Sequence, residues 1–225
     1  MIKAIFFDLF FTLIDPIYFD ENNEYDVLNI TPEEWETYAE DIRLYNDRAL
    51  GKVKSGIEIL DRIAEIIPIP ITVNEKNEIL IRRENRMRNA LISVRVEIIN
   101  TLITLKDMNL KIGIISNADI IDKKYWYESP LAQYFDIAIF SCDVGLLKPD
   151  TRIYKYAIDK LNIKPSECIF VGDGGSNELA GAKEVGMKTV FSEFLQEKEA
   201  EKREYILNSA DYYIKDFNQL LQYIK

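Results

Sequence analysis

The sequence predicts an α/β protein: a Rossmann-like, doubly wound parallel sheet that carries an inserted α-helical domain. From residue 94 onward, short apolar runs rich in β-branched and aromatic residues alternate with helical stretches, which is typical of a parallel sheet covered by helices on both faces. A similar run opens the chain, but residues 16–93 offer only helical signals. We therefore expect an α/β core domain made of residues 1–15 and 94–225, and a helical domain made of residues 16–93.

The strands are expected where apolar residues follow one another almost without interruption. Such continuous runs indicate strands that are buried on both faces. The runs are residues 3–10 (KAIFFDLF), 110–117 (LKIGIISN), 135–143 (FDIAIFSCD), 168–173 (CIFVGD) and 188–192 (KTVFS).

The inserted residues contain a helix start and a break. Thr31 precedes Pro32, and Glu34 stands three positions after Thr31, which is the pattern of a capped first helical turn. Two closely spaced prolines in residues 68–72 (PIPIT) cannot continue a helix. They therefore divide the insertion into two helical parts.

Composition places the chain among ordinary globular proteins. Of its 225 residues, 48% are hydrophobic and 29% are charged, and the formal net charge is −10. Because phosphate backbones are bound through clustered Lys and Arg, this charge argues against a nucleic-acid partner. No window approaches the ~18 consecutive apolar residues of a membrane span, and the chain opens on an apolar strand without a charged leader. We expect a cytoplasmic protein without a membrane partner, and a homodimer is compatible with the sequence.

The absence of histidine narrows the chemistry. It excludes a Ser-His-Asp triad, a Cys-His pair and a His-ligated zinc site. Cys142 and Cys168 are too few for a disulfide framework, so both are expected to be reduced thiols in the core. Catalysis would have to rely on carboxylates, lysine, hydroxyl groups and a hard metal ion.

Polar residues stand where the expected strands end. Asp8 follows the first strand, Ser116 and Asn117 end the second, Lys148 follows the third, and Asp173 ends the fourth. Ligands of open parallel sheets bind beyond the carboxyl ends of the strands. We therefore expect an anion and metal site there, with Asp8 as nucleophile and Lys148 as the balancing charge.

The ordered set of motifs resembles the haloacid dehalogenase (HAD) superfamily. The segments DLFFTL (8–13), IISN (114–117), KPDTRIY (148–154) and GDGGSNELAGAKEVGM (172–187) look like its four motifs. The insertion resembles the mobile cap domain that many members carry after the first motif. The resemblance implies a hydrolase that acts on a small, anionic substrate.

The resemblance also implies catalytic roles. Asp8 would attack the substrate and form a covalent aspartyl intermediate. Thr12 and Ser116 would donate hydrogen bonds to the transferring group, and Asn117 lies beside them in the second motif. Lys148 would balance the negative charge.

A Mg²⁺ site is implied as well. Asp8, the backbone carbonyl of Phe10 and Asp173 would hold the ion, which fits the preference of Mg²⁺ for a few carboxylate oxygens. The fourth motif departs from the common GDSxxND, because Gly174 replaces the serine and Glu178 the final aspartate. The longer Glu178 still permits a contact to the metal through a water molecule.

Phe10 stands where phosphatases of the superfamily carry an aspartate that acts as general acid and base. Such catalysis contributes ~10² to 10⁴ in rate, so a phosphatase without it should be slow on alkyl phosphates. Three hypotheses remain: a Mg²⁺-dependent phosphohydrolase, a 2-haloacid dehalogenase whose halide needs no proton, and a metabolite-binding protein with little turnover. We favour the first, because a carboxylate such as Asp173 beside Asp8 calls for a divalent cation.

Other polar and aromatic residues are interpreted as structural. The basic cluster of residues 81–89 (IRRENRMRN) is expected on a solvated helix face laced with ion pairs. Arg48 and Lys52 are expected to pair at the surface with nearby aspartates. Hydrophobic packing is expected for three aromatic residues: Tyr18, Trp126 and Tyr127.

Overall fold

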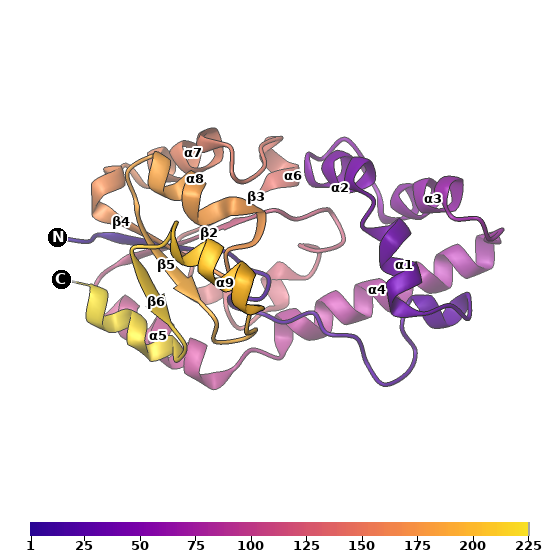
Figure 1. Cartoon of the computed structure of the whole chain (residues 1–225), viewed down its shortest axis with the longest axis horizontal. Helices are drawn as coiled ribbons and strands as arrows, with labels where there is room; N and C mark the ends of the chain where they lie inside the picture. The colour runs from indigo at the N-terminus through magenta and orange to yellow at the C-terminus, as the bar shows by residue number, and fades with distance from the viewer. Residues whose placement is uncertain (225) are drawn as a thin grey trace.

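The computed structural model describes residues 1–224 and contains a parallel sheet with helices on both faces (Figure 1). The strand order is β3-β2-β1-β4-β5-β6, and each pair of neighbours is parallel. This confirms the predicted fold class. The strands are β1 (Ala4–Phe7), β2 (Lys111–Ser116), β3 (Ile137–Phe140), β4 (Cys168–Gly172), β5 (Lys188–Ser192) and β6 (Tyr212–Ile214).

The alternation of side chains along β1 divides the core between the two faces of the sheet. Ile5 and Phe7 join a hydrophobic cluster on the face covered by α5 (Val96–Asp107). Ala4 and Phe6 join the cluster on the other face, which α7 (Thr151–Leu161) and α8 (Glu178–Glu184) cover. All four of these side chains are fully buried, as expected for the central strand of such a sheet.

The inserted residues form a second group of helices beside the sheet (Figure 1). These are α1 (Pro32–Ala39), α2 (Ile42–Ala49), α3 (Gly56–Ile66) and α4 (Val73–Ile92). They pack around a hydrophobic cluster that includes Trp35, Leu60 and Ile79. No described helix combines the length and the apolar character needed to cross a bilayer. The boundaries at residues 15 and 94 stay a prediction.

The predicted start of the first inserted helix is present. The Thr31 hydroxyl accepts a hydrogen bond from the Glu34 amide at 3.2 Å, and the Glu34 carboxylate accepts one from the Thr31 amide at 3.0 Å. This reciprocal pair satisfies two backbone donors at the start of α1. The prolines of residues 68–72 lie between α3 and α4, as predicted.

The ends of two strands differ from the prediction. The first strand stops at Phe7, since the chain turns after Asp8, and the third stops at Phe140, where α6 (Ser141–Val144) begins. The Ser141 hydroxyl donates to the Ala49 carbonyl at 2.7 Å and accepts from the Ala118 amide at 3.0 Å. These contacts with α2 and the loop after β2 replace sheet pairing beyond Phe140.

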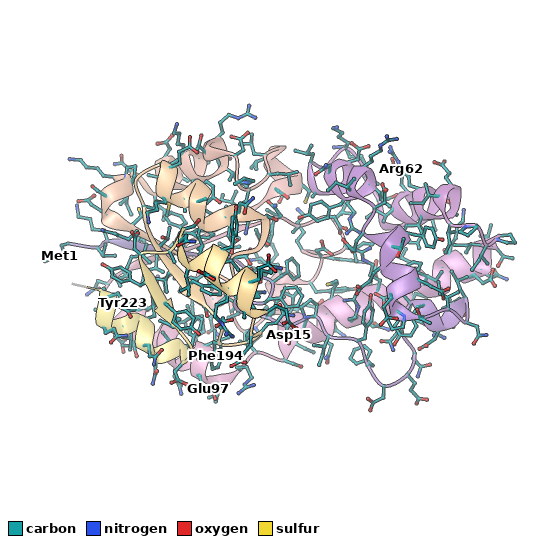
Figure 2. All side chains as sticks on the ribbon, in the orientation of Figure 1. Met1, Asp15, Arg62, Glu97, Phe194 and Tyr223 are labelled. Carbon is teal, nitrogen blue, oxygen red and sulfur yellow. The ribbon has the colours of Figure 1, made fainter. Side chains whose placement is uncertain are left out.

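Several short elements complete the chain. Asp15 lies at the junction of the sheet and the insertion (Figure 2). Helix α9 (Ala200–Leu207) precedes β6. The 3-10 helices are Tyr25–Val27, Trp126–Glu128, Ala132–Tyr134, Pro165–Glu167, Gly175–Asn177 and Phe217–Tyr223.

Candidate active site

Asp8 is presented by a tight turn at the carboxyl end of β1. The Phe11 amide donates to the Ile14 carbonyl at 2.7 Å, and Phe11 has a φ of 57°. This left-handed conformation is unfavourable for a bulky residue, and such strain is found mainly at functional sites. The Thr12 hydroxyl lies 3.4 Å from Asp8 Oδ2 and donates to it. The turn therefore fixes the carboxylate at the rim of the sheet.

Lys148 joins two buried carboxylates. Its Nζ contacts Asp8 Oδ1 and lies 2.5 Å from Glu178 Oε2. Burial alone would lower the pKa of Lys148, but the adjacent charges of Asp8 and Glu178 raise it above its usual value. Burial raises the pKa of Asp8 and of Glu178, and the charge of Lys148 opposes that rise. The ammonium group is therefore charged at neutral pH and offsets the two carboxylates.

Asn117 holds the loop that carries Lys148. The Lys148 amide donates to Asn117 Oδ1 at 2.8 Å, and Asn117 Nδ2 donates to the Lys148 carbonyl at 3.2 Å. Ser116, the preceding residue, is fully buried, and its hydroxyl lies 3.5 Å from the Asn117 carbonyl. The Asn117 side chain thus positions Lys148 by binding the backbone amide and carbonyl of that residue.

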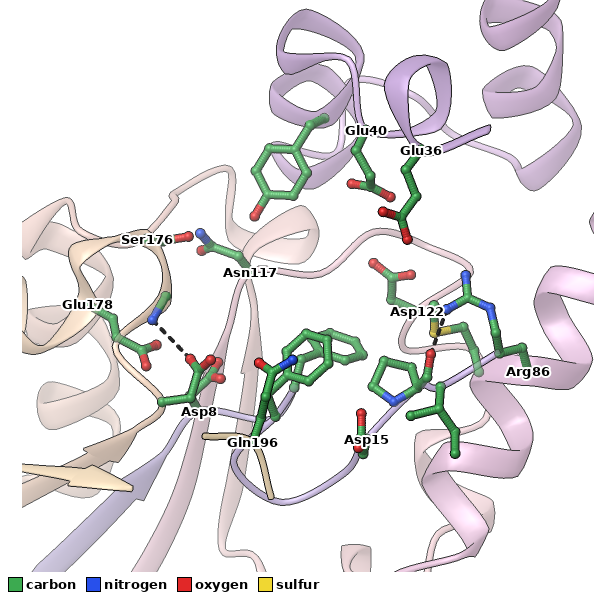
Figure 3. Close-up of a pocket in the computed structure, with 18 of the residues that line it drawn as sticks. Asp8, Asp15, Glu36, Glu40, Arg86, Asn117, Asp122, Ser176, Glu178 and Gln196 are labelled. Atoms are coloured by element: carbon green, nitrogen blue, oxygen red, sulfur yellow. Dashed lines mark hydrogen bonds between the residues drawn. The ribbon is translucent and has the colours of Figure 1, made fainter. Parts of the chain in front are cut away.

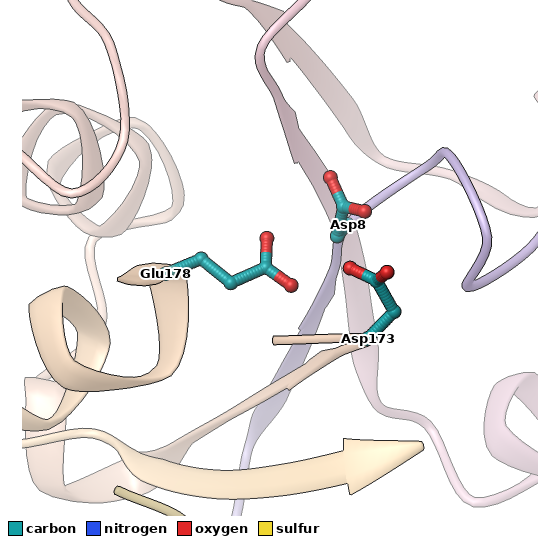
Figure 4. Close-up of side chains that lie close together, drawn as sticks. All are labelled: Asp8, Asp173 and Glu178. Carbon is teal, nitrogen blue, oxygen red and sulfur yellow. The ribbon is translucent and has the colours of Figure 1, made fainter. Parts of the chain in front are cut away.

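Asp173, which follows β4, completes a cluster of three carboxylates with Asp8, which follows β1, and Glu178, which begins α8. One carboxylate oxygen each from Asp8, Asp173 and Glu178 lies within 4.8 Å of the others (Figure 4). Hard cations such as Mg²⁺ are held by carboxylate oxygens in such arrangements. The residues present therefore fit a divalent cation.

The glycines of the fourth motif let Glu178 fold back toward the cluster. A Cβ on Gly172 would lie 2.0 Å from Glu178 Oε1, so any larger residue there would displace the Glu178 carboxylate from this position. The Gly174 amide donates to Glu178 Oε1 at 3.2 Å, and Gly174 itself has a φ of 84°. The turn thus places the Glu178 carboxylate against Lys148.

A cavity of about 710 Å³ opens from this rim toward the inserted helices. Figure 3 shows Asp8, Glu178 and Asn117 on the side of the sheet, with Glu36 and Glu40 reaching down from the insertion. Ligand sites of small molecules are hollows of ~300–1,000 Å³. The inserted residues in its wall include Tyr18, Glu36, Glu40, Tyr45, Arg48, Arg83, Arg86 and Met87.

The family is decided by the extent of the match. A family model described as "haloacid dehalogenase-like hydrolase" matches residues 2–186. The chain belongs to this family. Its parallel sheet is thus that of a HAD-like hydrolase.

A named relative agrees with this assignment. A glyceraldehyde 3-phosphate phosphatase from Pyrococcus furiosus is 36% identical over 130 residues, which cover 56% of this chain and 52% of that protein. The chain thus spans about half the length of this relative.

Two solved structures show the same fold. A HAD family enzyme from Bacteroides thetaiotaomicron, in complex with magnesium and inorganic phosphate, has a TM-score of 0.68 at 19% identity, covering 89% of this chain and 98% of that chain. A 2-haloacid dehalogenase from Pseudomonas syringae has a TM-score of 0.64 at 22% identity, covering 99% of this chain and 97% of that chain. At these identities the likeness concerns the fold.

The structure brings most of the predicted site residues of this HAD-like hydrolase together. Asp8, Lys148, Asp173 and Glu178 meet at the rim, and Phe10 lines the cavity. Thr12 contacts Asp8, Asn117 contacts the loop of Lys148, and Ser116 is buried at the end of β2. Their catalytic and metal-binding roles stay predictions.

The interpretation of two basic residues as solvated is wrong. Arg83 is 4% exposed and pairs with Asp119 at 3.1 Å and Asp122 at 3.3 Å. Arg48 is 3% exposed and lies 2.5 Å from Glu40 and 3.5 Å from Asp119. The aspartates of the loop after β2 lie under the insertion and draw both guanidinium groups inward. The sequence did not reveal these ion pairs, because Arg48 and Arg83 are far from Asp119 and Asp122 in the chain.

Other structural interpretations have mixed outcomes. The surface pair of Lys52 with Asp47 is present at 2.9 Å, and Trp126 is buried in the core. Tyr127 is 91% exposed, so its assignment to hydrophobic packing is wrong. Tyr18 packs edge-to-face on Tyr25 but also lines the cavity.

Sequence reasoning missed two residues of the cavity wall. Lys198, from the loop after β5, lies 2.5 Å from Asp173 Oδ2. Tyr45 of α2 lines the same cavity as Asn117 and Ser176, and burial raises its pKa. Lys198 stands in a run of charged residues typical of a surface, and Tyr45 belongs to no motif. Neither carried a signal in the sequence.

Proposed function

We propose that this HAD-like hydrolase is a Mg²⁺-dependent phosphohydrolase that uses Asp8 as its nucleophile on a small phosphorylated metabolite. The observation that carries the proposal is the buried contact of Asp8 with Lys148, next to Asp173 and Glu178, at the mouth of the cavity. The proposed nucleophile, the charge of Lys148 and the proposed cation site would thus lie beside a space of metabolite size.

In this proposal each residue of the rim has a defined task. Asp8 attacks phosphorus with one carboxylate oxygen, the leaving oxygen departs, and water then cleaves the resulting aspartyl phosphate. Lys148 balances the negative charge of Asp8 and of the transferring group. Thr12 steadies the Asp8 carboxylate through its hydroxyl. Ser116 is proposed to donate to the phosphoryl oxygens.

The proposed cation site uses Asp8, the Phe10 carbonyl and Asp173, with Glu178 in contact through water. When bound, Mg²⁺ would neutralise phosphate oxygens and orient them for in-line attack. The proximity of the three carboxylates supports this assignment, since Lys148 and Lys198 bring two positive charges to three carboxylates and leave one negative charge uncompensated. The glyceraldehyde 3-phosphate phosphatase relative supports a small phosphorylated substrate.

A second candidate function is 2-haloacid dehalogenation. Phe10 favours it, because a halide leaves without a proton and needs no acid at that position. The same Asp8 would displace the halide, and Lys148 would bind the carboxylate of the haloacid. Asp173 argues for the phosphohydrolase, because it adds a negative charge that dehalogenation does not require.

The two functions are separated by one substrate panel. We expect release of phosphate from aryl, acyl and alkyl phosphates, including glyceraldehyde 3-phosphate, to require Mg²⁺ and to stop when EDTA is added. The panel also contains 2-chloropropionate, with halide measured in the presence of EDTA. Halide release without metal, combined with no phosphate release, would replace the phosphohydrolase with the dehalogenase.

A further inference from the structure

Lys198 forms a second buried ion pair in the site. Its Nζ lies 2.5 Å from Asp173 Oδ2, and both side chains are 7% exposed. The residue comes from the loop between β5 and α9, and it also lines the cavity. No motif includes it, and the proposed mechanism gives it no task.

The loop is built to aim Lys198 inward. The fully buried carboxylate of Glu193 accepts hydrogen bonds from the Lys198 amide at 2.6 Å, from Arg203 Nε at 2.8 Å and from the Tyr213 hydroxyl at 2.5 Å. Lys198 Nζ also donates to Gln196 Oε1 at 2.7 Å. Because three groups fix the base of the loop, the ammonium group is held at Asp173 instead of extending into solvent.

The charges at the rim show what this lysine does. Asp8 and Glu178 share the ammonium group of Lys148, whereas Asp173 is paired with Lys198. A buried carboxylate without a partner is strongly destabilising. Lys198 therefore supplies the positive charge that balances Asp173.

We infer that Lys198 is a tethered cation that competes with Mg²⁺ for Asp173 and that, once released, binds the anionic group of the substrate. The inference rests on the proposed Mg²⁺ site. Mg²⁺ reaches Asp173 only in molecules in which Lys198 has left that carboxylate. The apparent affinity for Mg²⁺ is therefore the intrinsic affinity multiplied by the fraction of such molecules. A phosphate in the cavity gives the released ammonium group a new partner. Metal and phosphate should therefore strengthen each other's binding.

The test is a calorimetric titration of the whole chain with MgCl₂, in the presence and absence of inorganic phosphate. In the native protein, phosphate is expected to tighten Mg²⁺ binding. In Lys198→Met, Mg²⁺ without phosphate is expected to bind about tenfold more tightly, and phosphate should tighten Mg²⁺ binding less than in the native protein, because only the direct attraction between the ion and phosphate is left. Lys198→Gln removes the same charge with a polar side chain and serves if the methionine variant does not fold.

The matched control is Lys202→Met, because Lys202 is an exposed cavity-wall lysine for which no ion pair is found in residues 1–224. It loses the same charge but no contact with Asp173, so its Kd for Mg²⁺ should stay within about twofold of the native value. An equal shift in both lysine variants would overturn the inference in favour of general electrostatics.

The remaining outcomes separate this inference from the proposed function. If the native protein binds Mg²⁺ and Lys198→Met binds it equally or more weakly, the competition does not exist although the metal site does. If only Lys198→Met binds Mg²⁺, Lys198 occupies the cation site of the native protein permanently. The proposed Mg²⁺ dependence of the native enzyme is then refuted. If neither binds Mg²⁺, both ideas are wrong.

Discussion

The role of Asp8 can be tested by a change of one atom. Asp8→Asn keeps the shape of the side chain but makes it a far poorer nucleophile, so hydrolysis of any phosphate or haloacid should fall below detection. The amide can still contact Lys148, and the fold should persist. Product release and the far-UV circular dichroism spectrum are the measurements. A folded variant that still turns over would remove Asp8 from the chemistry.

Phe10 makes a prediction about leaving groups. With an aromatic ring in place of the general acid, the enzyme should prefer aryl and acyl phosphates, which leave as stable anions, over alkyl phosphates. Phe10→Asp should narrow that preference by raising turnover of alkyl phosphates up to about 10²-fold. The ratio of kcat/KM for aryl and alkyl phosphates measures it.

Stability has to be followed in the same variant. Phe10 packs against the core cluster and against the cluster of the insertion, so its removal is expected to lower the free energy of unfolding by about 3 kcal/mol. An unchanged ratio in a folded Phe10→Asp protein would mean that another group, such as Tyr45, already transfers the proton.

The two thiols make a prediction about pH. Burial raises the pKa of Cys142 to about 11 and that of Cys168 to about 12. A raised thiol pKa keeps the neutral form dominant up to that pH, so the reactive thiolate is scarce at pH 8. Both residues should react slowly with Ellman's reagent at pH 8 in the native protein and quickly in 6 M guanidinium chloride. Rapid reaction at pH 8 without denaturant would contradict the buried placement of Cys168 and the half-buried placement of Cys142.

At the scale of elements, α4 is tied to the loop after β2 by Arg83. Arg83→Met would leave Asp119 and Asp122 with less compensating charge in a buried position, which should lower the free energy of unfolding by about 3–5 kcal/mol. Arg88→Met is the control on the same helix, because Arg88 is 51% exposed and pairs with the exposed Glu128. It should change stability by less than about 1 kcal/mol. Urea denaturation of both variants gives the comparison, and equal losses would contradict the prediction.

The sequence could predict elements that depend on local patterns, but it could not predict environments that tertiary contacts create. Continuous apolar runs predict β1, β2, β4 and β5 because each is buried on both faces and keeps its pattern whatever surrounds it. Local signals also predict α1, whose cap lies within four residues. Arg83 and Lys198 are different, since their environment is set by carboxylates that tertiary folding brings to them. The three-residue β6 is too short to show a pattern of its own.

At the scale of the whole molecule, cation binding should be visible as stability. A ligand that binds only the folded state stabilises it by about 2.7 kcal/mol at 100 times its Kd. Mg²⁺ should therefore raise the thermal midpoint of the native protein. The Asp173→Ala variant should show neither this shift nor Mg²⁺-dependent turnover.

The control for that experiment is Asp143→Ala, which removes an aspartate that is 49% exposed and pairs with Lys123. It should keep the Mg²⁺ shift of the native protein in a thermal denaturation measurement. A shift that survives in Asp173→Ala would place the ion elsewhere on the molecule.

The strand order has a consequence for how the protein is made. β1 is synthesised first, yet it lies between β2 and β4, and Asp8 meets Lys148 across 140 residues of chain. At ~5–20 residues per second, the ribosome delivers these partners many seconds later. Until β2 has been made, the apolar β1 has no partner strand in the nascent chain, and such exposed apolar segments are the kind that chaperones protect. Asp8 is thus translated well before Lys148, and the contact between the two side chains can form only after those 140 residues have been added.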